Sequence, residues 1–360
     1  MAPTASNGQR VALHRYPDGQ MRPSDFVVED QPRPAPDAGH FVMRTMFVSV
    51  DPMLRLFVDR APFGGAMPAM PLGTTIPGAA VGEIVESRHP DFAVGDLVEG
   101  RFGWQSFALS DGGGVVRVDP RLGPPENALG IAGLPGFTAY VGLEAAGGVK
   151  PGETFLVSGA AGAVGSVAGA LIRARGGRAV GIAGGEDKCR YLVDRIGYAA
   201  AVDRHAPDFL ERLRAALPTG ANVYFDNVGG PLLASVVPLM ARGGLVLISG
   251  LMAQYQGDAP GGRDNLPAVL RAVMMNGMRI QGFTQAGRSD LRPGFEAELA
   301  ALVASGGIDT DLHIIDGIER LPEAMCGLFE NSTTGKVLVR VTPADRQQDS
   351  AQLALVEEKQ

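Results

Sequence analysis

The sequence predicts an α/β protein with two parts: an irregular β domain that forms a partly open barrel, and a doubly wound parallel sheet of six strands. Short strand-like runs fill roughly the first 130 residues, and from residue 154 short apolar segments alternate with segments of helical length. Continuously apolar strands that are each followed by a helix are typical of a parallel sheet covered on both faces. A chain of 360 residues is also longer than one hydrophobic core usually serves, which favours two domains.

The β domain is predicted from six runs that are separated by Gly, Pro and Asp, as at residues 93–96. Such punctuation between short strands is typical of a partly open barrel. The predicted strands are residues 26–30, 41–50, 79–86, 94–99, 105–109 and 115–118.

The parallel sheet is predicted from six short apolar strands with helical segments between them. Six strands are the full number of a dinucleotide-binding fold. The strands are residues 154–158, 179–183, 200–203, 223–226, 245–249 and 279–283, and the helices are residues 164–175, 187–196, 207–216, 232–240 and 266–276.

A last β/α/β segment, with strands at residues 313–316 and 336–341 around a helix at 322–330, is predicted to return to the first domain. The expected limits are therefore 1–134 with 307–343 for the barrel domain and 135–306 for the cofactor domain. Residues 344–360 are polar and are expected to form a frayed tail.

Composition narrows the class of protein. A net charge of −7 argues against a nucleic-acid partner, which would require concentrated Lys and Arg. No apolar stretch approaches the roughly 20 residues of a membrane helix, and the polar start does not resemble a secretory signal. Two cysteines offer no disulfide framework, so we expect a cytoplasmic protein with no membrane partner.

Gly159, Gly162 and Gly165 recur every third residue between a predicted strand and a predicted helix that starts near Ala163 and Val164. Glycine here permits a tight turn, lets backbone N–H groups approach a pyrophosphate and allows close packing of helix on sheet. A glycine pattern alone is weak evidence, and a glycine-rich turn without a nucleotide is the alternative. The strand, helix and further strands around this one favour a dinucleotide site.

The end of the second predicted strand bears on the choice between NAD and NADP. A site that prefers NAD has an Asp or Glu there to bind the ribose 2′-hydroxyl. This strand ends in glycine at 184 and 185, Lys188 follows, and Arg204 comes after the third strand. Lys188 and Arg204 therefore predict a 2′-phosphate site and an NADP(H) cofactor. The alternatives are a solvated helix face for Lys188 and a ribose contact from Glu186 or Asp187.

The five histidines and two cysteines form no cluster with the spacing of zinc ligands. Cys189 and Cys326 are predicted to be packing residues. We therefore expect no metal, and another group must polarise the substrate. Tyr255 follows the fifth predicted strand, and ligands of open α/β sheets bind outside the carboxyl ends of the strands. Its phenol can donate a hydrogen bond to a carbonyl oxygen that gains negative charge; packing against the cofactor or the loop is the alternative.

Three more side chains are candidates for this region. Asn227, after the fourth strand, is predicted to contact the cofactor, whereas Asp226 is expected to brace the loop. Thr138 opens a predicted helix between the domains and is expected to face the nicotinamide. Trp104, the only tryptophan, either lines a substrate cleft or packs in a core.

Together these segments resemble the zinc-free medium-chain dehydrogenase/reductase family, in particular its branch of prostaglandin reductases, leukotriene B4 12-hydroxydehydrogenases, alkenal double-bond reductases and curcumin reductases. The resemblance extends from about residue 11 to 341. It rests on residues 50–55, 136–140, 159–166, 224–230, 249–255, 282–283 and 335–336.

The resemblance implies a GroES-like β-barrel domain joined to a Rossmann domain, a homodimer, and NADPH-dependent reduction of the C=C bond of α,β-unsaturated ketones or aldehydes. Hydride would add to the β-carbon, with the enolate oxygen near Tyr255. The expected cofactor contacts are Gly162, Ala163, Val164, Gly165, Lys188, Arg204, Asn227, Ser249, Gly250, Tyr255, Gly282, Phe283, Thr333 and Thr138. The expected substrate contacts are Met53, Trp104 and Tyr255.

Three positions depart from the family pattern. Arg204 stands where the family commonly has Tyr, which preserves a preference for NADP. Thr333 stands in place of a common Asn. The sequence therefore does not decide whether residue 333 contacts the cofactor. Met53 stands in place of a common Tyr, so we expect the pocket wall and the substrate preference to differ.

The leading hypothesis is reduction of a small α,β-unsaturated carbonyl substrate. The alternatives are a zinc-independent quinone reductase, an alcohol dehydrogenase of the same superfamily, and a non-catalytic NADPH-binding protein. Hydride transfer to a quinone needs no proton donor such as Tyr255. A need for Tyr255 therefore distinguishes enone reduction from quinone reduction.

Overall fold

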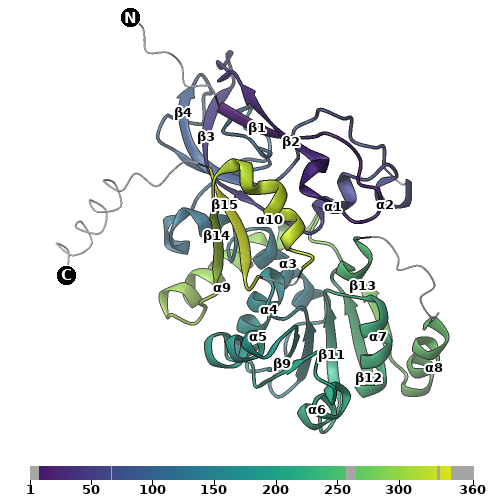
Figure 1. The fold of residues 1–360 in the computed structure, drawn as a ribbon. Coiled ribbons are helices and arrows are strands. Elements are labelled where there is room, and N and C mark those ends of the chain that lie inside the picture. The colour runs from purple at the N-terminus through teal and green to yellow at the C-terminus, as the bar shows by residue number, and fades with distance from the viewer. Residues whose placement is uncertain (1–7, 66, 257–264, 331–332, 342–360) are drawn as a thin grey trace, which may run out of the picture.

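The computed structural model describes residues 8–65, 67–256, 265–330 and 333–341. Figure 1 shows a β domain above and a sheet with surrounding helices below. The predicted polar tail, residues 344–360, lies outside the described residues. In the part of the chain that is described, no helix combines the length and the apolar character needed to cross a membrane.

Six parallel strands form the sheet of the lower domain, in the spatial order β10-β9-β8-β11-β12-β13. Numbered along the chain this is the order 3-2-1-4-5-6 of a Rossmann sheet, which confirms the predicted fold class. The order reverses between β8 and β11, and such sheets bind ligands in the crevice at the reversal. The strands are β8 (Thr154–Ser158), β9 (Arg178–Ala183), β10 (Ala200–Asp203), β11 (Ala221–Asp226), β12 (Met240–Ile248) and β13 (Arg279–Gly282).

The helices of this domain follow the prediction with three differences. Residues 187–196 divide into α5 and a π-helical turn at Leu192–Ile196. The helix predicted to reach residue 240 ends earlier, because Pro238 has no N–H to donate, and Met240 already belongs to β12. The helix α9, which buries Phe295 against α3, was not predicted. The helices are α3 (Leu134–Ala145), α4 (Ala163–Ala174), α5 (Glu186–Tyr191), α6 (Phe209–Ala216), α7 (Gly230–Val236), α8 (Leu266–Asn276) and α9 (Arg292–Ala304).

The upper domain contains a sheet with the order β14-β15-β3-β4-β5-β7, and β6 also pairs with β3. One strand was not predicted: β1 pairs antiparallel with β2, and its Gln and Arg interrupt the apolar pattern. The strands are β1 (Gly8–Leu13), β2 (Phe26–Gln31), β3 (Phe41–Ser49), β4 (Ala80–Ser87), β5 (Leu97–Gly100), β6 (Phe107–Ser110) and β7 (Val116–Arg117), with the short helices α1 (Leu54–Phe57) and α2 (Pro62–Gly65) after β3.

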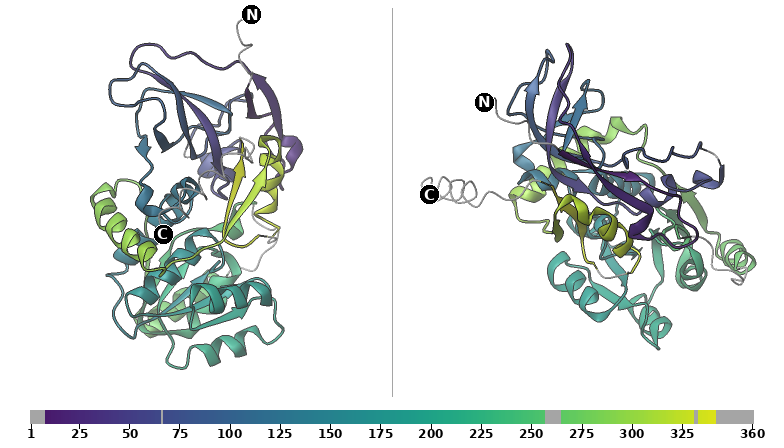
Figure 2. Two further views of the ribbon diagram at one scale, coloured as in Figure 1. Left: turned by 90° about the vertical axis from the view of Figure 1, so that its left-hand side faces the viewer. Right: turned by 45° about the horizontal axis from the view of Figure 1, so that its top comes forward.

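The end of the described chain returns to this upper domain. After α9 come β14 (Leu312–Asp316), α10 (Leu321–Gly327) and β15 (Lys336–Arg340). β15 pairs antiparallel with β3, and Figure 2 shows this late segment running up beside the first strands. The Rossmann sheet is therefore inserted between two segments that share one sheet. The limits at residues 134/135 and 306/307 stay our proposed domain boundaries.

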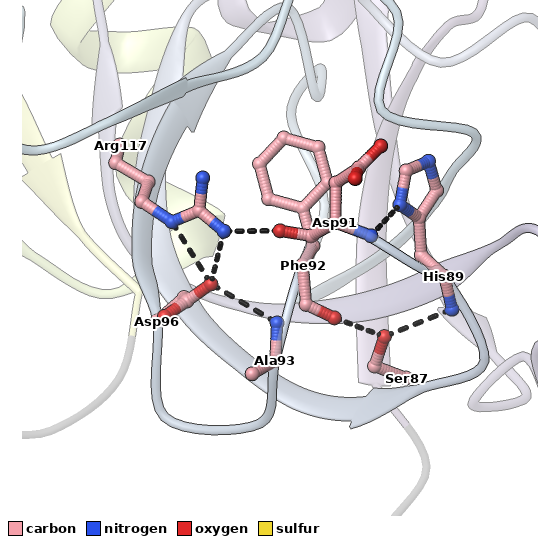
Figure 3. A network of polar contacts seen from close by, with 7 residues as sticks. All are labelled: Ser87, His89, Asp91, Phe92, Ala93, Asp96 and Arg117. Atoms are coloured by element: carbon pink, nitrogen blue, oxygen red, sulfur yellow. Dashed lines mark hydrogen bonds and ion pairs between the residues drawn. The ribbon is translucent and has the colours of Figure 1, made fainter.

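A polar network fixes the connection between β4 and β5 (Figure 3), and none of its residues lines the cleft described below. The Ser87 hydroxyl donates to the Phe92 carbonyl (2.5 Å) and accepts from the His89 N–H (3.1 Å). Arg117 pairs with Asp96 at 3.1 Å, and its guanidinium lies 4.9 Å from the centre of the Phe92 ring. These contacts therefore hold the connection after β4 against β7, which carries Arg117.

Candidate active site

A cleft of about 490 Å³ lies between the two domains. One wall is formed where β8, β11 and β12 end, by Gly159, Asn227 and Ser249. The opposite wall comes from the upper domain; residues 50–53, which follow β3, are called the barrel wall below. The volume lies within the range of roughly 300–1,000 Å³ that is usual for ligand and cofactor sites. The cleft therefore stands at the crevice that the strand order predicts.

The phosphate loop, residues 159–165, connects β8 to α4. Gly159 has a φ of 57°, a left-handed conformation that favours glycine. A Cβ atom on Gly165 would lie 2.5 Å from the Gly159 carbonyl oxygen, so α4 can pack this close only with glycine there. The backbone conformation at Gly159 and the close packing at Gly165 therefore account for these two glycines without a ligand.

Gly162 is less constrained by its surroundings than Gly165. A Cβ atom there would meet only the Gly159 carbonyl oxygen, at 3.2 Å. Gly162 lines the cleft together with Ala163 and Val164, at the start of α4, where N–H groups lack acceptors within the helix. Such a helix start with an open glycine fits the close approach of a pyrophosphate, and the residues present thus fit a dinucleotide.

Two cations line the cleft beside the phosphate loop. Lys188 on α5 is half-buried, and Arg204 follows β10. Burial and the nearby Arg204 lower the pKa of Lys188. Two like charges that disfavour each other are stabilised by an anion between them, so this end of the cleft suits a phosphate group.

The two carboxylates that were the alternative contacts for a ribose are engaged elsewhere. Glu186 accepts a hydrogen bond from Arg212 at 2.9 Å, and Asp187 pairs with Arg190. Neither belongs to the residues that line the cleft. The alternative of a ribose contact from Glu186 or Asp187 therefore finds no support in the geometry.

The loop after β11 is braced by Asp226, in agreement with the expectation. Its buried Oδ1 accepts from the Ser158 hydroxyl (2.7 Å), the Tyr224 hydroxyl (2.9 Å) and the N–H groups of Val228 and Gly229 (3.0 Å each). Burial, then the nearby Asp226 charge, raises the pKa of Tyr224 far above its ordinary value, so this phenol stays a donor. The hydrogen bonds to Asp226 therefore fix the loop that carries Asn227.

Asn227 lines the cleft, and a backbone carbonyl holds its side chain. Its Nδ2 donates to the Ser158 carbonyl at 2.8 Å. The same residue's backbone N–H donates to the Ser158 hydroxyl at 2.9 Å. One N–H of the amide is used in this way, which leaves the amide oxygen and the second N–H for a ligand.

Tyr255 lines the cleft at the end of a short 3-10 turn, Met252–Gln254. Its hydroxyl oxygen accepts from the Leu251 N–H at 3.4 Å, so the hydroxyl proton can be donated to another group. The next residue, Gln256, accepts from the Met21 N–H at 3.2 Å. This contact ties the loop of the Rossmann domain to the barrel domain and thereby places Tyr255 between them.

The barrel wall and its neighbours form the rest of the lining. Met53 lies in the wall. Thr138 lies one turn inside α3, not at its start as predicted, and its hydroxyl donates to the Leu134 carbonyl at 2.7 Å. Thr333 and Phe329 line the cleft from the late segment. This side is largely apolar, apart from the ion pair between Lys336 and Asp51 at 2.7 Å.

Three predicted site residues do not line the cleft. Gly282 ends β13, and the Phe283 ring packs edge-on against Phe225, with ring centres 5.8 Å apart. Trp104 is fully buried in the barrel core, 6.0 Å from the ring of Phe26. The core alternative for Trp104 therefore agrees with the structure, because the whole indole is enclosed by the first domain.

Sequence reasoning missed several lining residues. Gln256, Leu328 and Phe329 carry no motif, and only the tertiary fold brings them to the cleft. Lys336 did leave a signal, because it is a lysine at the start of an apolar strand and is only 4% exposed. A buried lysine demands a partner, and that partner is Asp51.

No group of three or more His, Cys, Asp or Glu side chains among the described residues is arranged to hold a metal ion. Cys189 is buried and Cys326 is partly buried. Burial raises the pKa of the two thiols, to about 11 for Cys189 and to about 12 for Cys326. Both are packing residues in this structure, as expected.

Known proteins share this architecture. Residues 9–118 match the family described as N-terminal domain of oxidoreductase, and residues 163–301 match that described as zinc-binding dehydrogenase. The NADPH-dependent curcumin reductase of Escherichia coli (strain K12) is 35% identical over 347 residues, which cover 96% of this chain and 100% of that protein. The chain belongs to the zinc-free branch of the medium-chain dehydrogenase/reductase family. It is an oxidoreductase.

Two further relatives agree with this assignment. Prostaglandin reductase 1 of Mus musculus is 33% identical over 333 residues, covering 91% of this chain and 97% of that protein. The crystal structure of CurA from Vibrio vulnificus in complex with NADPH superimposes with a TM-score of 0.87 at 32% identity, covering 93% of this chain and 99% of that one. The family and the fold predicted from the sequence are thus confirmed.

Proposed function

We propose that this oxidoreductase uses NADPH to reduce the C=C bond of α,β-unsaturated ketones and aldehydes. The observation that carries the proposal is one cleft that is lined by two cations, Lys188 and Arg204, by Tyr255 and by the largely apolar barrel wall. Relatives that cover almost the whole chain are a curcumin reductase and a prostaglandin reductase, and both names agree with this substrate class.

The residues of the Rossmann side would hold the cofactor. The open glycine and helix start at Gly162 suit the pyrophosphate, and Lys188 with Arg204 suits the 2′-phosphate. The amide oxygen of Asn227 and the residues after β12, Ser249 and Gly250, suit the nicotinamide half; Thr138 and Thr333 line the same cleft. When bound, NADPH supplies the hydride for the β-carbon of the substrate.

The chain's own part in the chemistry is to bind the enone, exclude water and hold a proton donor at the carbonyl oxygen. Tyr255 is the donor in this proposal, because its oxygen already accepts from Leu251 and its proton is left for the substrate. Such a hydrogen bond strengthens as negative charge develops on the oxygen of the enolate. The apolar wall with Met53 would contact the carbon skeleton.

The test is a panel of medium-chain enones, alkenals, quinones and alcohols, with NADPH or NADP⁺ and with EDTA present. We expect oxidation of NADPH with enones and enals, with the saturated carbonyl compound as product. Activity on quinones alone would favour the quinone reductase, and loss of activity with EDTA would contradict a reaction without a metal. NADPH binding without turnover of any acceptor would favour a non-catalytic role.

We further propose a cytoplasmic homodimer formed through the edge of the Rossmann sheet. β13 pairs only with β12 among the described strands, and Ile280 on it is exposed. On the neighbouring α8, Leu270, Met274 and Met275 are also exposed, and Figure 1 shows α8 at this side of the sheet. An unpaired strand beside apolar side chains is a surface that a second copy can cover.

Sedimentation can test the dimer. We expect a dimer for the native chain and a monomer after Ile280→Glu with Met274→Glu. Val94→Glu, at an exposed apolar position of the barrel domain, should leave the mass unchanged. A native monomer would contradict the proposed assembly.

A further inference from the structure

The start of β15 connects the two walls of the cleft through successive residues. The Gly335 N–H donates to the Ala161 carbonyl of the phosphate loop at 2.8 Å, and Gly335 forms a parallel bridge with Gly162. Lys336 and Val337, which follow directly, contact the barrel wall instead. One short stretch of backbone thus touches the cofactor side and the substrate side.

Gly335 is held tightly in this place. Its φ is 73°, and a Cβ atom on it would lie 2.0 Å from the Asp311 carbonyl oxygen. That same carbonyl accepts from the Lys336 N–H at 3.0 Å. A non-glycine residue would therefore be strained and would clash, so the strand start cannot shift away from the phosphate loop without breaking these contacts.

The Lys336 side chain reaches from this fixed point to the barrel wall. Its Nζ donates to the Val50 carbonyl at 2.8 Å and to Asp51 Oδ1 at 2.7 Å. The backbone adds a third link, because the Val50 N–H donates to the Val337 carbonyl at 3.2 Å. The barrel wall lines the cleft, so Lys336 links that wall to the strand start that contacts the phosphate loop.

A charged side chain is not needed here for packing alone. The Lys336 side chain is 4% exposed and that of Asp51 is 17% exposed, and apolar residues of similar volume often replace such a pair without loss of stability. What an ion pair adds is a defined geometry for both partners. The pair therefore fits a role in positioning the wall.

We propose that Lys336 is a positioning residue that transmits order from the phosphate loop to residues 50–53, so that cofactor binding sets the substrate wall. The inference rests on the proposed function, in which the phosphate loop binds NADP(H) and the wall contacts the enone. Lys336 acts through Asp51 and Val50 and takes no part in proton or hydride transfer.

The first test is hydrogen exchange of the full chain with and without NADP⁺. We expect NADP⁺ to slow exchange in the peptide that covers residues 49–55 of the native protein. In Lys336→Met this protection should be lost, although NADP⁺ still protects the phosphate loop. Protection of residues 49–55 that persists in Lys336→Met would overturn the proposal, as would its absence in the native protein.

The second test separates positioning from a general loss of stability. Lys336→Met should raise the KM for an enone by about 10-fold or more, and the Kd for NADPH should stay within about twofold of the native value. Asp51→Asn should give the same pattern, and the double variant should be no worse than either single variant. Strictly additive losses would contradict a shared role.

The matched control is Arg175→Met, which removes two ion pairs of the Rossmann domain. Arg175 contacts Glu144 and Glu298 at 2.7 Å each and is 17% exposed, but it does not line the cleft. We expect a lower melting temperature with an unchanged KM for the enone. An equal rise of KM in Arg175→Met would mean that the Lys336 effect is only structural and would overturn the proposal.

The proposed reaction and the coupling through Lys336 can fail separately. If hydrogen exchange depends on Lys336 as expected but no enone is reduced, the coupling holds and the proposed reaction is wrong. If enones are reduced but NADP⁺ does not change the hydrogen exchange of residues 49–55, the proposed reaction holds and the coupling is wrong.

Discussion

The two ends of the cleft are built in different ways. At the cofactor end, the phosphate loop, Lys188, Arg204 and Asn227 follow four strands of one parallel sheet. At the substrate end, the lining comes from separate parts of the chain, and the Lys336–Asp51 contact joins residues 285 positions apart. The topology of one sheet therefore brings the residues of the first end together, whereas the second end depends on how two domains pack.

The largest effect is expected from Tyr255→Phe at the substrate end. Loss of a hydrogen-bond donor to a developing oxyanion typically lowers kcat by about 10²–10³-fold. We expect this loss with enones, with an unchanged Kd for NADPH, as measured by steady-state kinetics and fluorescence titration. Quinone reduction is the internal control and should change little. An unaltered kcat for enones would remove Tyr255 from the mechanism.

At the cofactor end, Lys188→Ala with Arg204→Ala should raise the KM for NADPH by about 10²-fold, because each charged hydrogen bond to the phosphate is worth about 1.5–3 kcal/mol and Arg204 is exposed. The KM for NADH should hardly change. Arg190→Ala is the matched control, since Arg190 pairs with Asp187 outside the cleft. Equal effects on both cofactors would show that these residues do not recognise the 2′-phosphate.

Two glycines of one loop give a finer comparison. Gly165→Ala should lower the free energy of unfolding by about 1–3 kcal/mol, because its Cβ would overlap the Gly159 carbonyl. Gly162→Ala should unfold almost as the native chain does, yet its Kd for NADPH should rise by about 10-fold, which corresponds to about 1.4 kcal/mol. Chemical denaturation and fluorescence titration measure the two quantities. If Gly162→Ala bound NADPH normally, the pyrophosphate would lie elsewhere.

The smallest expected effect is a pH dependence of the cofactor preference. The pKa of Lys188 is lowered by burial and by Arg204, so its charge is lost at a lower pH than that of an ordinary lysine. The KM for NADPH should therefore rise by about threefold as the pH increases toward 10. The corresponding free energy is a fraction of that of one charged hydrogen bond to the phosphate. The KM for NADH should not follow. Lys188→Arg should abolish the rise, and a rise that persists would exclude Lys188 as its cause.

The cofactor end could be predicted from the sequence because its signals are local. The spacing of Gly159, Gly162 and Gly165, and the glycines that replace an acidic residue after β9, act within one βαβ unit. The Rossmann strands were predicted for the same reason, since their apolar runs need no knowledge of distant residues.

The substrate end could not be predicted to the same depth. Gln256 reaches the barrel through a contact with Met21, and no local pattern encodes that pairing. The position of Trp104 was uncertain because an aromatic side chain near other aromatics suits a cleft as well as a core. In the structure β1 and β2 bury Trp104 in the core, and β1 was not predicted. Long-range packing is what sequence patterns leave out.

The central claim is hydride transfer to the β-carbon of an enone, and isotope transfer tests it most directly. NADPH deuterated at the transferred position would be oxidised with a medium-chain enone, and the product analysed by NMR and mass spectrometry. The proposed function predicts one deuterium at the β-carbon and a solvent-derived hydrogen at the α-carbon. Deuterium on the carbonyl carbon, or an enone recovered unchanged, would contradict it.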